Sequence, residues 1–372
     1  MGKRILITGG AGFLGSHLTD ALLKRGHEVR IYDNLTPQVH GDGFPSYLTG
    51  DIELVRGDMR DSEKLQGALA GIEVIYHLAA AVGVGQSMYE IAHYMGTNTQ
   101  GTANLLQALL DSGNQLEKLI VASSMSIYGE GKYLCLRCGE VAPAARTAEQ
   151  LKEKRWESYC PQCSEVVAPI PTDEGKPLQC SSIYALSKKD QEEMILLFGR
   201  TYQVPVVALR FFNIYGTRQA LSNPYTGVMA IFASRLLNRR APLIFEDGLQ
   251  MRDFVSVHDA VEANLLAMER SEVSGIALNV GSGEAISIRE VAATLGGALG
   301  SEIEGEISGK YRAGDIRHCF GDITAARRLL GYQPQMKFSE GVRELADWLR
   351  SQSAEDRAAE AAQQLNAFGL TA

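Results

Sequence analysis

The sequence predicts an α/β fold, a doubly wound parallel sheet followed by a smaller lobe. Short β-rich runs alternate with helical segments through the N-terminal half, which is the pattern of a parallel sheet covered on both faces. A glycine-rich turn joins the first strand to the first helix, in "LITGGAGFLGSHL". Of the 372 residues, 45% are hydrophobic and 22% are charged, which is typical of a globular chain and not of a disordered or membrane-embedded one.

The predicted elements follow the chain in order. Residues 3–34 predict a strand, a glycine turn, a helix with apolar residues at helical spacing that stops at Gly26, and a second strand. Further strands are expected in "IELVRGD", "VIYHLAAA", "KLIVASS" and "PVVALRFFN", with helices at residues 101–112 and 188–202. After Gly216 the pattern is less regular, and "GLQMRDFVSVHDAVEANLLAMER" predicts a strand followed by a helix.

Charge and hydropathy narrow the range of partners. The formal net charge of −8 and the pI near 5.5 argue against a broad basic surface for nucleic acid or anionic lipid. The N-terminus, "MGKRILITGG", has an apolar run that is too short for a signal peptide or a membrane span. We therefore expect a cytoplasmic protein with no nucleic-acid partner and no membrane association.

The glycine turn and the next strand predict a dinucleotide site. Gly9, Gly12 and Gly15 have the spacing that lets the backbone approach a pyrophosphate at the N-terminus of the following helix. Asp33 ends the next strand, where a carboxylate accepts hydrogen bonds from the adenosine ribose and repels a 2′-phosphate. The pattern favours a Rossmann-like site for NAD over NADP, and a turn without a ligand is the alternative. Asp58 either approaches the adenine or is a solvated turn acid.

A second group of residues carries acid–base chemistry. Tyr184 and Lys188 lie four residues apart at the start of a predicted helix, so both side chains fall on one face. An ammonium group beside a phenol stabilises the phenolate and lowers its pKa, which suits a proton-transferring tyrosine. The strand "VASSMSIYG" ends in hydroxyls at Ser123 and Ser124, and one of them can bind the same substrate oxygen. Without such a partner, a Tyr–Lys pair alone is usually a solvated helix face.

With these residues in place, the sequence resembles the extended short-chain dehydrogenase/reductase family, and within it the NAD-dependent nucleotide-sugar epimerases and dehydratases. The resemblance covers residues 3–350 apart from a cysteine-rich segment. The motifs that carry it are "TGGAGFLGSHL", "HLAA", "SSMSIYG", "YALSK", "RFFNIYG", "QMRDFVSVHDAV", "NVGSG" and "GDIRHCFGD". So many motifs in the same order make a chance match very improbable.

The resemblance implies a role for each matching residue. Tyr184 is expected to be the acid/base at the sugar hydroxyl, Lys188 to bind the nicotinamide ribose and tune the tyrosine, and Ser124 to be the hydroxyl partner. The residues expected to bind NAD are Gly9, Gly12, Phe13, Leu14, Gly15, Asp33, Asn34, Asp58, Met59, Leu78, Ala79, Ala80, Asn98, Tyr184 and Lys188. The residues expected to bind a nucleotide-diphosphate sugar are Val84, Ser124, Ser126, Asn213, Arg252 and Arg312. The planar guanidinium of arginine suits phosphate, although Arg252 would also serve as a salt bridge between lobes.

One departure from the family pattern narrows the reaction. The 4,6-dehydratases carry an Asp–Glu pair directly after the catalytic hydroxyl residue, and here Met125 and Ser126 stand at those positions. Dehydration is therefore disfavoured, and the expected reaction is 4-epimerisation through a transient 4-keto sugar. The loop "AAAVGVGQSMYEI" is similar to that of dTDP-L-rhamnose 4-epimerases, which favours dTDP-L-rhamnose or a related 6-deoxyhexose. The alternatives are a 4-dehydrogenase or ketoreductase that releases its keto sugar, and a non-catalytic nucleotide sensor.

The cysteine-rich segment predicts a metal site. Between Gly129 and Tyr184 lie 54 residues, more than the family usually has there, and the excess contains "CLRC" and "CPQC". Two such pairs can present four thiolates in a tetrahedron, so Cys135, Cys138, Cys160 and Cys163 predict a closed, structural zinc site in a zinc-ribbon-like insertion. The ribbon would staple a loop, form a lid or offer a partner surface, and the alternative is four cysteines without metal. Cys180 and Cys319 are expected to be packed thiols.

These assignments divide the chain into domains. Residues 1–210 form the expected NAD-binding domain, with the insertion at 130–170. Residues 211–350 form mainly the substrate lobe, with 253–282 returning to the Rossmann core. Residues 351–372 are expected to be an exposed helical tail of little specificity. Family members commonly pair through a four-helix interface, so we expect a homodimer formed by the helices near Gly101 and Lys188.

Overall fold

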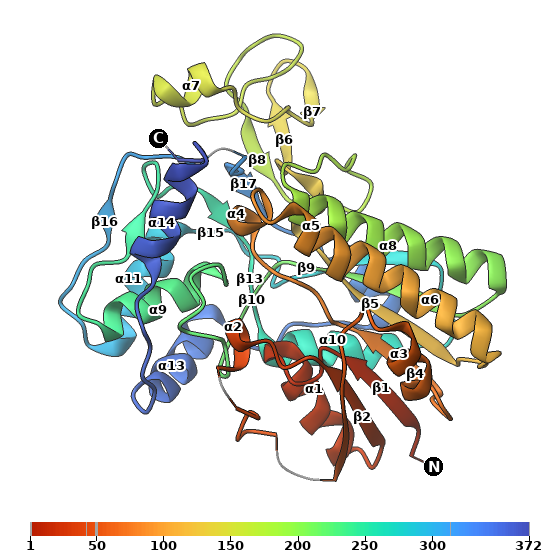
Figure 1. Ribbon diagram of the computed structural model, residues 1–372. Helices are drawn as coiled ribbons and strands as arrows, with labels where there is room; N and C mark the ends of the chain where they lie inside the picture. Colours follow the sequence, from red (N-terminus) through yellow and green to blue (C-terminus); the bar gives the residue numbers. More distant parts are fainter. Residues whose placement is uncertain (1, 42, 49–50, 313, 372) are drawn as a thin grey trace.

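Seven parallel strands form the central sheet of the protein (Figure 1). The computed structural model describes residues 2–41, 43–48, 51–312 and 314–371. The strands, in spatial order, are β3 (Ile52–Arg56), β2 (Glu28–Asp33), β1 (Arg4–Thr8), β4 (Val74–His77), β5 (Lys118–Ser124), β9 (Val206–Phe211) and β14 (Ile276–Val280). The chain order reverses between β1 and β4, which is the switch point at which doubly wound sheets bind ligands.

Side chains of the sheet alternate between two cores because successive strand residues point to opposite faces. Ile5 and Ile7 of β1 pack into one core, and Leu6 packs into the other. The helices on the first face are α1 (Phe13–Lys24), α10 (Val257–Glu269) and α12 (Thr324–Leu330). The helices on the second face are α3 (Ser62–Ala68), α6 (Gly101–Ser112) and α8 (Ile183–Tyr202). The predicted α/β fold is confirmed.

A smaller lobe lies beside the carboxyl ends of the strands. Its core is formed by α9 (Val228–Leu237), α11 (Ile288–Leu299) and α13 (Phe338–Leu349). Its short strands are β10 (Asn213–Tyr215), β11 (Leu243–Ile244), β12 (Met251–Arg252), β13 (Phe254–Ser256), β15 (Ile286–Ser287), β16 (Glu306–Ile307) and β17 (His318–Cys319). Between β13 and β15 the chain passes back through α10 and β14 on the main sheet, and between β17 and α13 it returns through α12, so the chain crosses between the two lobes five times.

The cysteine-rich insertion (residues 130–170) is a small unit of its own at the top of Figure 1. It contains an antiparallel sheet in the order β7-β6-β8, with one short helix. Its core consists of Tyr133, Val141 and Val167 together with the four cysteines. Its elements are β6 (Lys132–Cys135), β7 (Gly139–Val141), α7 (Ala148–Lys152) and β8 (Ala168–Ile170).

The remaining helices are short or lie at the C-terminal end. Most of α14 is exposed, as expected, but Ala361 and Leu365 are buried. Phe368, just after α14, stacks on Tyr89 with ring centroids 4.9 Å apart. The tail therefore packs on the loop that precedes α5. Among the described residues, no helix is long and apolar enough to cross a membrane. The remaining helices are α2 (Pro37–His40), α4 (Val84–Ser87), α5 (Ile91–Tyr94), a π-helix (Met95–Gln100), a 3₁₀-helix (Met125–Tyr128) and α14 (Ala358–Ala367).

Candidate active site

The glycine turn between β1 and α1 is built for close backbone approach. Gly9 has φ 71°, and a Cβ added to it would lie 2.8 Å from the backbone of Ala79. A Cβ on Gly15 would lie 2.4 Å from the carbonyl oxygen of Gly9, so the helix packs against the turn only because this residue is glycine. The turn leaves the N-terminus of α1 open to a ligand, and Phe13 and Leu14 begin that helix. This cradle fits the pyrophosphate of a dinucleotide.

Asp33 is held in place at the carboxyl end of β2. Its carboxylate accepts hydrogen bonds from the backbone N–H groups of Ala11 at 3.0 Å and Leu35 at 2.9 Å, so it lies beside the glycine turn. Asp58 follows β3 and is not simply solvated. A bidentate hydrogen bond from Arg60, at 2.8 Å for both pairs, holds the pKa of Asp58 below its usual range, and Asn34 donates to it at 3.1 Å.

The other predicted cofactor residues follow the same edge of the sheet. Met59 comes after β3, and Leu78, Ala79 and Ala80 come after β4. Asn98 lies in the π-helix, where its side chain bonds both backbone groups of Ala81 and donates to Ser187 at 2.9 Å. A π-helical segment is uncommon and frequently marks a functional site. The predicted residues therefore gather along the carboxyl ends of adjacent strands.

The predicted catalytic residues Ser124 and Tyr184 meet where β5 ends and α8 begins. Ser124 is the last residue of β5, and Tyr184 is in the first turn of α8, which starts at the cap Ser182. Burial raises the pKa of Tyr184, and a hydrogen bond with Ser124 acts in the opposite direction. Ser126 donates to the hydroxyl oxygen of Ser124 at 2.9 Å. Two hydroxyls, 58 and 60 positions away in sequence, are thus brought to the same place as the phenol.

Lys188 lies one helical turn after Tyr184 and is only 3% exposed. Burial lowers its pKa to about 7, so a small change in its surroundings shifts its protonation. Its Nζ donates to Gln191 Oε1 at 2.7 Å. Gln191 Nε2 in turn donates to Thr102 Oγ1 at 2.9 Å and lies 3.0 Å from His77 Nε2. The lysine is therefore held by a buried polar network that ties α8 to β4 and α6.

The two predicted diphosphate-binding arginines converge on one carboxylate. Arg312 Nη2 lies 2.9 Å from Asp315, and Arg252 Nη2 lies 3.7 Å from it. Arg252 also donates to the carbonyl oxygens of Met251, Ile316 and Arg317 at 2.6–2.9 Å. The contact to Asp315 is the longest of the polar contacts that Arg252 makes among the described residues. The amide oxygen of Asn213 is buried without a hydrogen-bond partner among the described residues, which leaves it free for a ligand.

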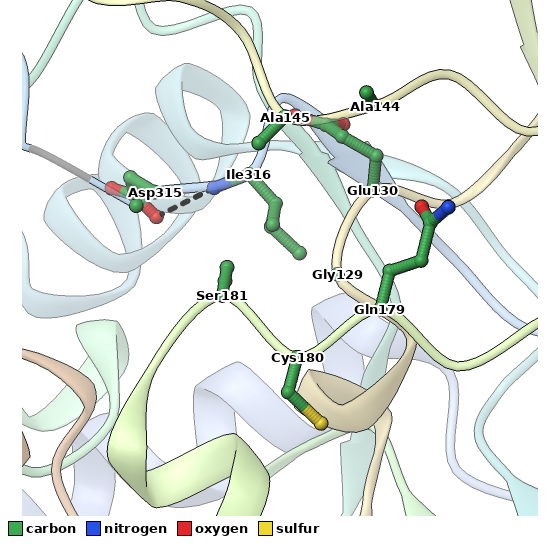
Figure 2. Close-up of a pocket in the computed structure, with 10 residues that line it drawn as sticks. Gly129, Glu130, Ala144, Ala145, Gln179, Cys180, Ser181, Asp315 and Ile316 are labelled. Atoms are coloured by element: carbon green, nitrogen blue, oxygen red, sulfur yellow. Dashed lines mark hydrogen bonds between the residues drawn. The ribbon is translucent and has the colours of Figure 1, made fainter.

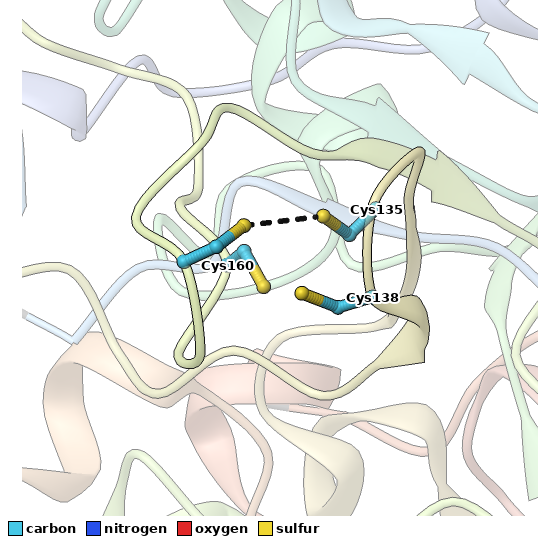
Figure 3. A group of neighbouring side chains, drawn as sticks. Cys135, Cys138 and Cys160 are labelled. Carbon is cyan, nitrogen blue, oxygen red and sulfur yellow. Dashed lines mark hydrogen bonds between the residues drawn. The ribbon is translucent and has the colours of Figure 1, made fainter.

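The four cysteines of the insertion form a tight cluster. All four sulfur atoms lie within 4.8 Å of one another, and Cys135 and Cys163 are 3.5 Å apart. Figure 3 shows Cys135 and Cys138 on one strand loop and Cys160 on the facing loop, with sulfur atoms turned toward a common centre. Cys180 and Cys319 lie outside this cluster.

A cavity of about 190 Å³ lies between the insertion and the start of α8 (Figure 2). Ala144 and Ala145 of the insertion form one wall, and Asp315 and Ile316 form another. Ser181, three residues before Tyr184, also lines the cavity and lies below Asp315 and Ile316 in Figure 2. The insertion therefore borders the segments that carry Tyr184 and Asp315.

Comparison with known proteins decides the family. Residues 5–150 match the NAD-dependent epimerase/dehydratase family, and residues 165–345 match the GDP-mannose 4,6-dehydratase family. The chain is 32% identical to the dTDP-L-rhamnose 4-epimerase of Burkholderia thailandensis, over 94% of this chain and 95% of that protein. The chain belongs to the NAD-dependent epimerase/dehydratase family.

Solved structures of this family have the same architecture. The UDP-glucose 4-epimerase of Thermus thermophilus, in complex with NAD, is 30% identical with a TM-score of 0.75, covering 94% of this chain and 99% of that one. A UDP-N-acetylglucosamine 4-epimerase from Methanobrevibacter ruminantium, in complex with UDP-N-acetylmuramic acid, is 29% identical with a TM-score of 0.76, covering 94% and 99%. The dehydratase-like match begins at residue 165, so it does not include Met125 and Ser126, which replace the acidic pair of the family's dehydratases.

Two features of this epimerase/dehydratase site escaped sequence analysis. Ser87 at the end of α4 is fully buried and accepts a hydrogen bond from the backbone N–H of Tyr184 at 3.0 Å, which fixes the first turn of α8. No sequence signal indicates this contact. Gln191 supports Lys188, and its spacing of three residues on the same helix face is a signal that could have revealed it. Val84 begins α4 and Ser87 ends it, so the loop predicted to bind the sugar is hydrogen-bonded to the first turn of α8.

Proposed function

We propose that this protein is an NAD-dependent nucleotide-sugar 4-epimerase that works through a transient 4-keto sugar. The observation that carries the proposal is the convergence of Ser124 and Tyr184 at the carboxyl end of β5, with Lys188 one helical turn later, on the same edge of the sheet as the glycine turn. Family membership and the replacement of the dehydratase acids by Met125 and Ser126 support the same reaction. A nucleotide sensor would need none of the three catalytic side chains.

The protein residues supply placement and proton transfer. The glycine turn and Asp33 would hold NAD, which would supply the redox chemistry at carbon 4. Tyr184 removes the proton from the 4-hydroxyl and later returns it, while Ser124 holds the same oxygen. Lys188, when protonated, favours the phenolate and binds the nicotinamide ribose. Asp33 accepts the ribose hydroxyls of the adenosine.

The substrate site lies between the lobes. We assign the diphosphate to Arg252, Arg312 and Asn213, and the sugar to the space beside Val84 and Ser126. Residues 1–210 then form the cofactor domain and residues 211–350 mainly the substrate lobe, with 253–282 in the main sheet. The similarity to the dTDP-L-rhamnose 4-epimerase favours a dTDP-linked 6-deoxyhexose as substrate.

The function is tested by NMR. The purified protein is incubated with dTDP-, UDP- and GDP-linked sugars, and the spectra are followed for inversion at carbon 4. We expect one group, headed by dTDP-L-rhamnose, to reach an equilibrium mixture of epimers without added coenzyme. In a second incubation NAD is added, and if NADH then accumulates in proportion to the sugar consumed, the protein is a 4-dehydrogenase. If none of the sugars changes although NAD is bound, the proposal is wrong.

We propose that the cysteine cluster binds one structural zinc ion. Four thiolates within 4.8 Å of one another have the number and type of ligands that zinc prefers, and a site closed by four cysteines has no open position for catalysis. The small core around Tyr133 is too limited to hold the insertion together alone. All six cysteines are free in the described structure, which suits a reducing compartment such as the cytoplasm.

We also propose that the protein forms a homodimer through α6 and α8, which lie side by side in Figure 1. Large apolar side chains are exposed on these helices: Leu110 is 40% exposed, Leu186 38% and Leu197 56%. Leu186 and Leu197 are separated by about three helical turns and share one face. We expect Leu197→Glu to convert the dimer to a monomer in analytical ultracentrifugation, because an unpaired carboxylate in the interface is costly. A wild-type monomer at micromolar concentration would contradict the proposal.

A further inference from the structure

The insertion is joined to the substrate lobe by charged groups, of which the Arg317 side chain is fully buried and the Glu157 side chain 40% exposed. Arg317, which has no exposed surface, donates to Glu157 of the insertion at 2.6 Å and to both carboxylate oxygens of Asp247 at 2.6 and 2.9 Å. His318, the next residue, bonds the other oxygen of Glu157 at 3.0 Å. The hydrogen bond from His318, with a further one from Arg317, lowers the pKa of Glu157 to about 2 against the effect of burial. One ionised carboxylate of the insertion therefore holds two consecutive residues of the substrate lobe.

From His318 and Arg317 the contacts continue to Arg252. His318 Nδ1 accepts a hydrogen bond from the backbone N–H of Met251 at 3.1 Å, so Nε2 carries the proton that Glu157 accepts. The carbonyl oxygen of Arg317 accepts from Arg252 Nη1 at 2.8 Å. Strand β17 also pairs with β12, which carries Arg252. Glu157 is thus connected to Arg252, a proposed diphosphate ligand, in two ways: through the carbonyl oxygen of Arg317, and through His318, which lies on the strand paired with β12.

A second set of contacts reinforces the first. Glu130, at the start of the insertion, accepts from the backbone N–H of Arg317 at 2.7 Å. Arg146 of the insertion donates to the carbonyl oxygen of Asp315 at 3.1 Å and pairs with Glu246 at 2.8 Å. The segment 315–317 is therefore hydrogen-bonded to the insertion at both of its ends, at Asp315 by Arg146 and at Arg317 by Glu130. Asp315 and Ile316 of the same segment line the cavity in Figure 2 together with Ala144 and Ala145 of the insertion.

We infer that the cysteine-rich insertion positions the diphosphate-binding arginines, with Glu157 as a positioning residue that acts through His318 and Arg317. The inference rests on the proposed function, because it takes Arg252 and Arg312 to bind the substrate diphosphate. Glu157 lies three residues before Cys160, so the cysteine cluster fixes the loop that carries it. The insertion would therefore serve substrate binding without touching the substrate, and its loss would leave the guanidinium of Arg317 buried and partly unpaired.

Glu157→Gln tests the inference in the full-length, NAD-bound protein. A glutamine can accept from Arg317 with its oxygen, but its amide N–H₂ then faces the N–H of His318. Either the hydrogen bond between residue 157 and His318 or the one that the backbone N–H of Met251 donates to His318 must therefore be lost. We expect the Kd for UDP, dTDP or GDP, whichever binds the wild type, to rise about tenfold in calorimetry. KM for the nucleotide sugar rises by a similar factor, while kcat, NAD occupancy and metal content stay near wild-type values.

The matched control is Glu153→Gln in the same insertion. Glu153 is exposed and, among the described residues, forms one ion pair, with Arg155 at 2.7 Å, so its replacement should leave the Kd unchanged. Glu157→Asp keeps the charge on a shorter side chain and should give an intermediate loss, which also serves if the glutamine variant does not fold. A folded Glu157 variant with wild-type affinity overturns the inference. If no nucleoside diphosphate binds the wild-type protein, the proposed function fails instead.

Discussion

Tyr184→Phe is expected to lower kcat by about 10²- to 10⁴-fold, since the variant loses the group that carries the proton at carbon 4. This corresponds to about 3–5 kcal/mol of transition-state stabilisation. The phenyl ring preserves the edge contact to Tyr94, whose ring centroid lies 6.5 Å away, so the first turn of α8 should remain in place. KM and NAD occupancy should change little, because the phenol oxygen is used in the chemical step. Epimerisation rates followed by NMR give kcat and KM.

Tyr94→Phe is the matched control. Tyr94 is buried, its ring packs against that of Tyr184, and its hydroxyl donates to Gln86 at 3.1 Å. We expect this variant to keep kcat within about threefold of the wild type and to lose at most the net value of one hydrogen bond, about 1 kcal/mol of stability. If Tyr184→Phe retained wild-type kcat, or if both variants lost activity equally, Tyr184 could not be the acid/base.

Replacing Cys138 and Cys163 together with serine is expected to abolish metal binding and unfold the insertion. These two cysteines are less buried than Cys135 and Cys160, so the substitution changes ligands with little effect on packing. Structural zinc sites contribute about 10–16 kcal/mol of apparent binding free energy, far more than this small core can replace. We expect zinc, measured by plasma mass spectrometry, to fall from one ion per chain to background. Protease cleavage should appear within residues 130–170, and KM for the nucleotide sugar should rise.

Cys180→Ser is the control for this experiment. Cys180 lies outside the cluster, on the wall of the cavity in Figure 2, and its thiol makes only a weak contact to the carbonyl oxygen of Ile127 at 3.8 Å. It should retain zinc and resist proteolysis like the wild type. A wild-type protein purified with no metal, or a double variant that keeps its zinc, would contradict the structural site.

The sequence was sufficient to predict those parts of the fold and site that depend on local patterns. Gly9, Gly12 and Gly15 mark the turn in the sequence, and at Gly9 and Gly15 an added Cβ would clash with Ala79 and with the Gly9 carbonyl oxygen. Tyr184 and Lys188 share a helix face by spacing alone. The four cysteines cluster as their two pairs predicted, although no spacing specifies the metal.

Contacts between distant segments were not predictable in this way. Ser87 and Tyr184 meet because α4 packs on α8, and neither sequence segment signals the other. The pairing of Glu157 with Arg317 joins residues 160 positions apart, and each is an ordinary charged residue in the sequence. Charged residues are usually exposed, so a buried guanidinium in the substrate lobe is evident only once the insertion is folded against it.

The central claim is that Tyr184, Ser124 and Lys188 carry out a reversible oxidation at carbon 4 inside one closed site. The most direct measurement uses a nucleotide sugar labelled with deuterium at carbon 4. We predict that the inverted product keeps its deuterium at carbon 4 and that no label enters added free coenzyme, because the hydride leaves and returns within the same site. Loss of the label to solvent or to free coenzyme during turnover, or no inversion of any sugar that binds, would contradict the claim.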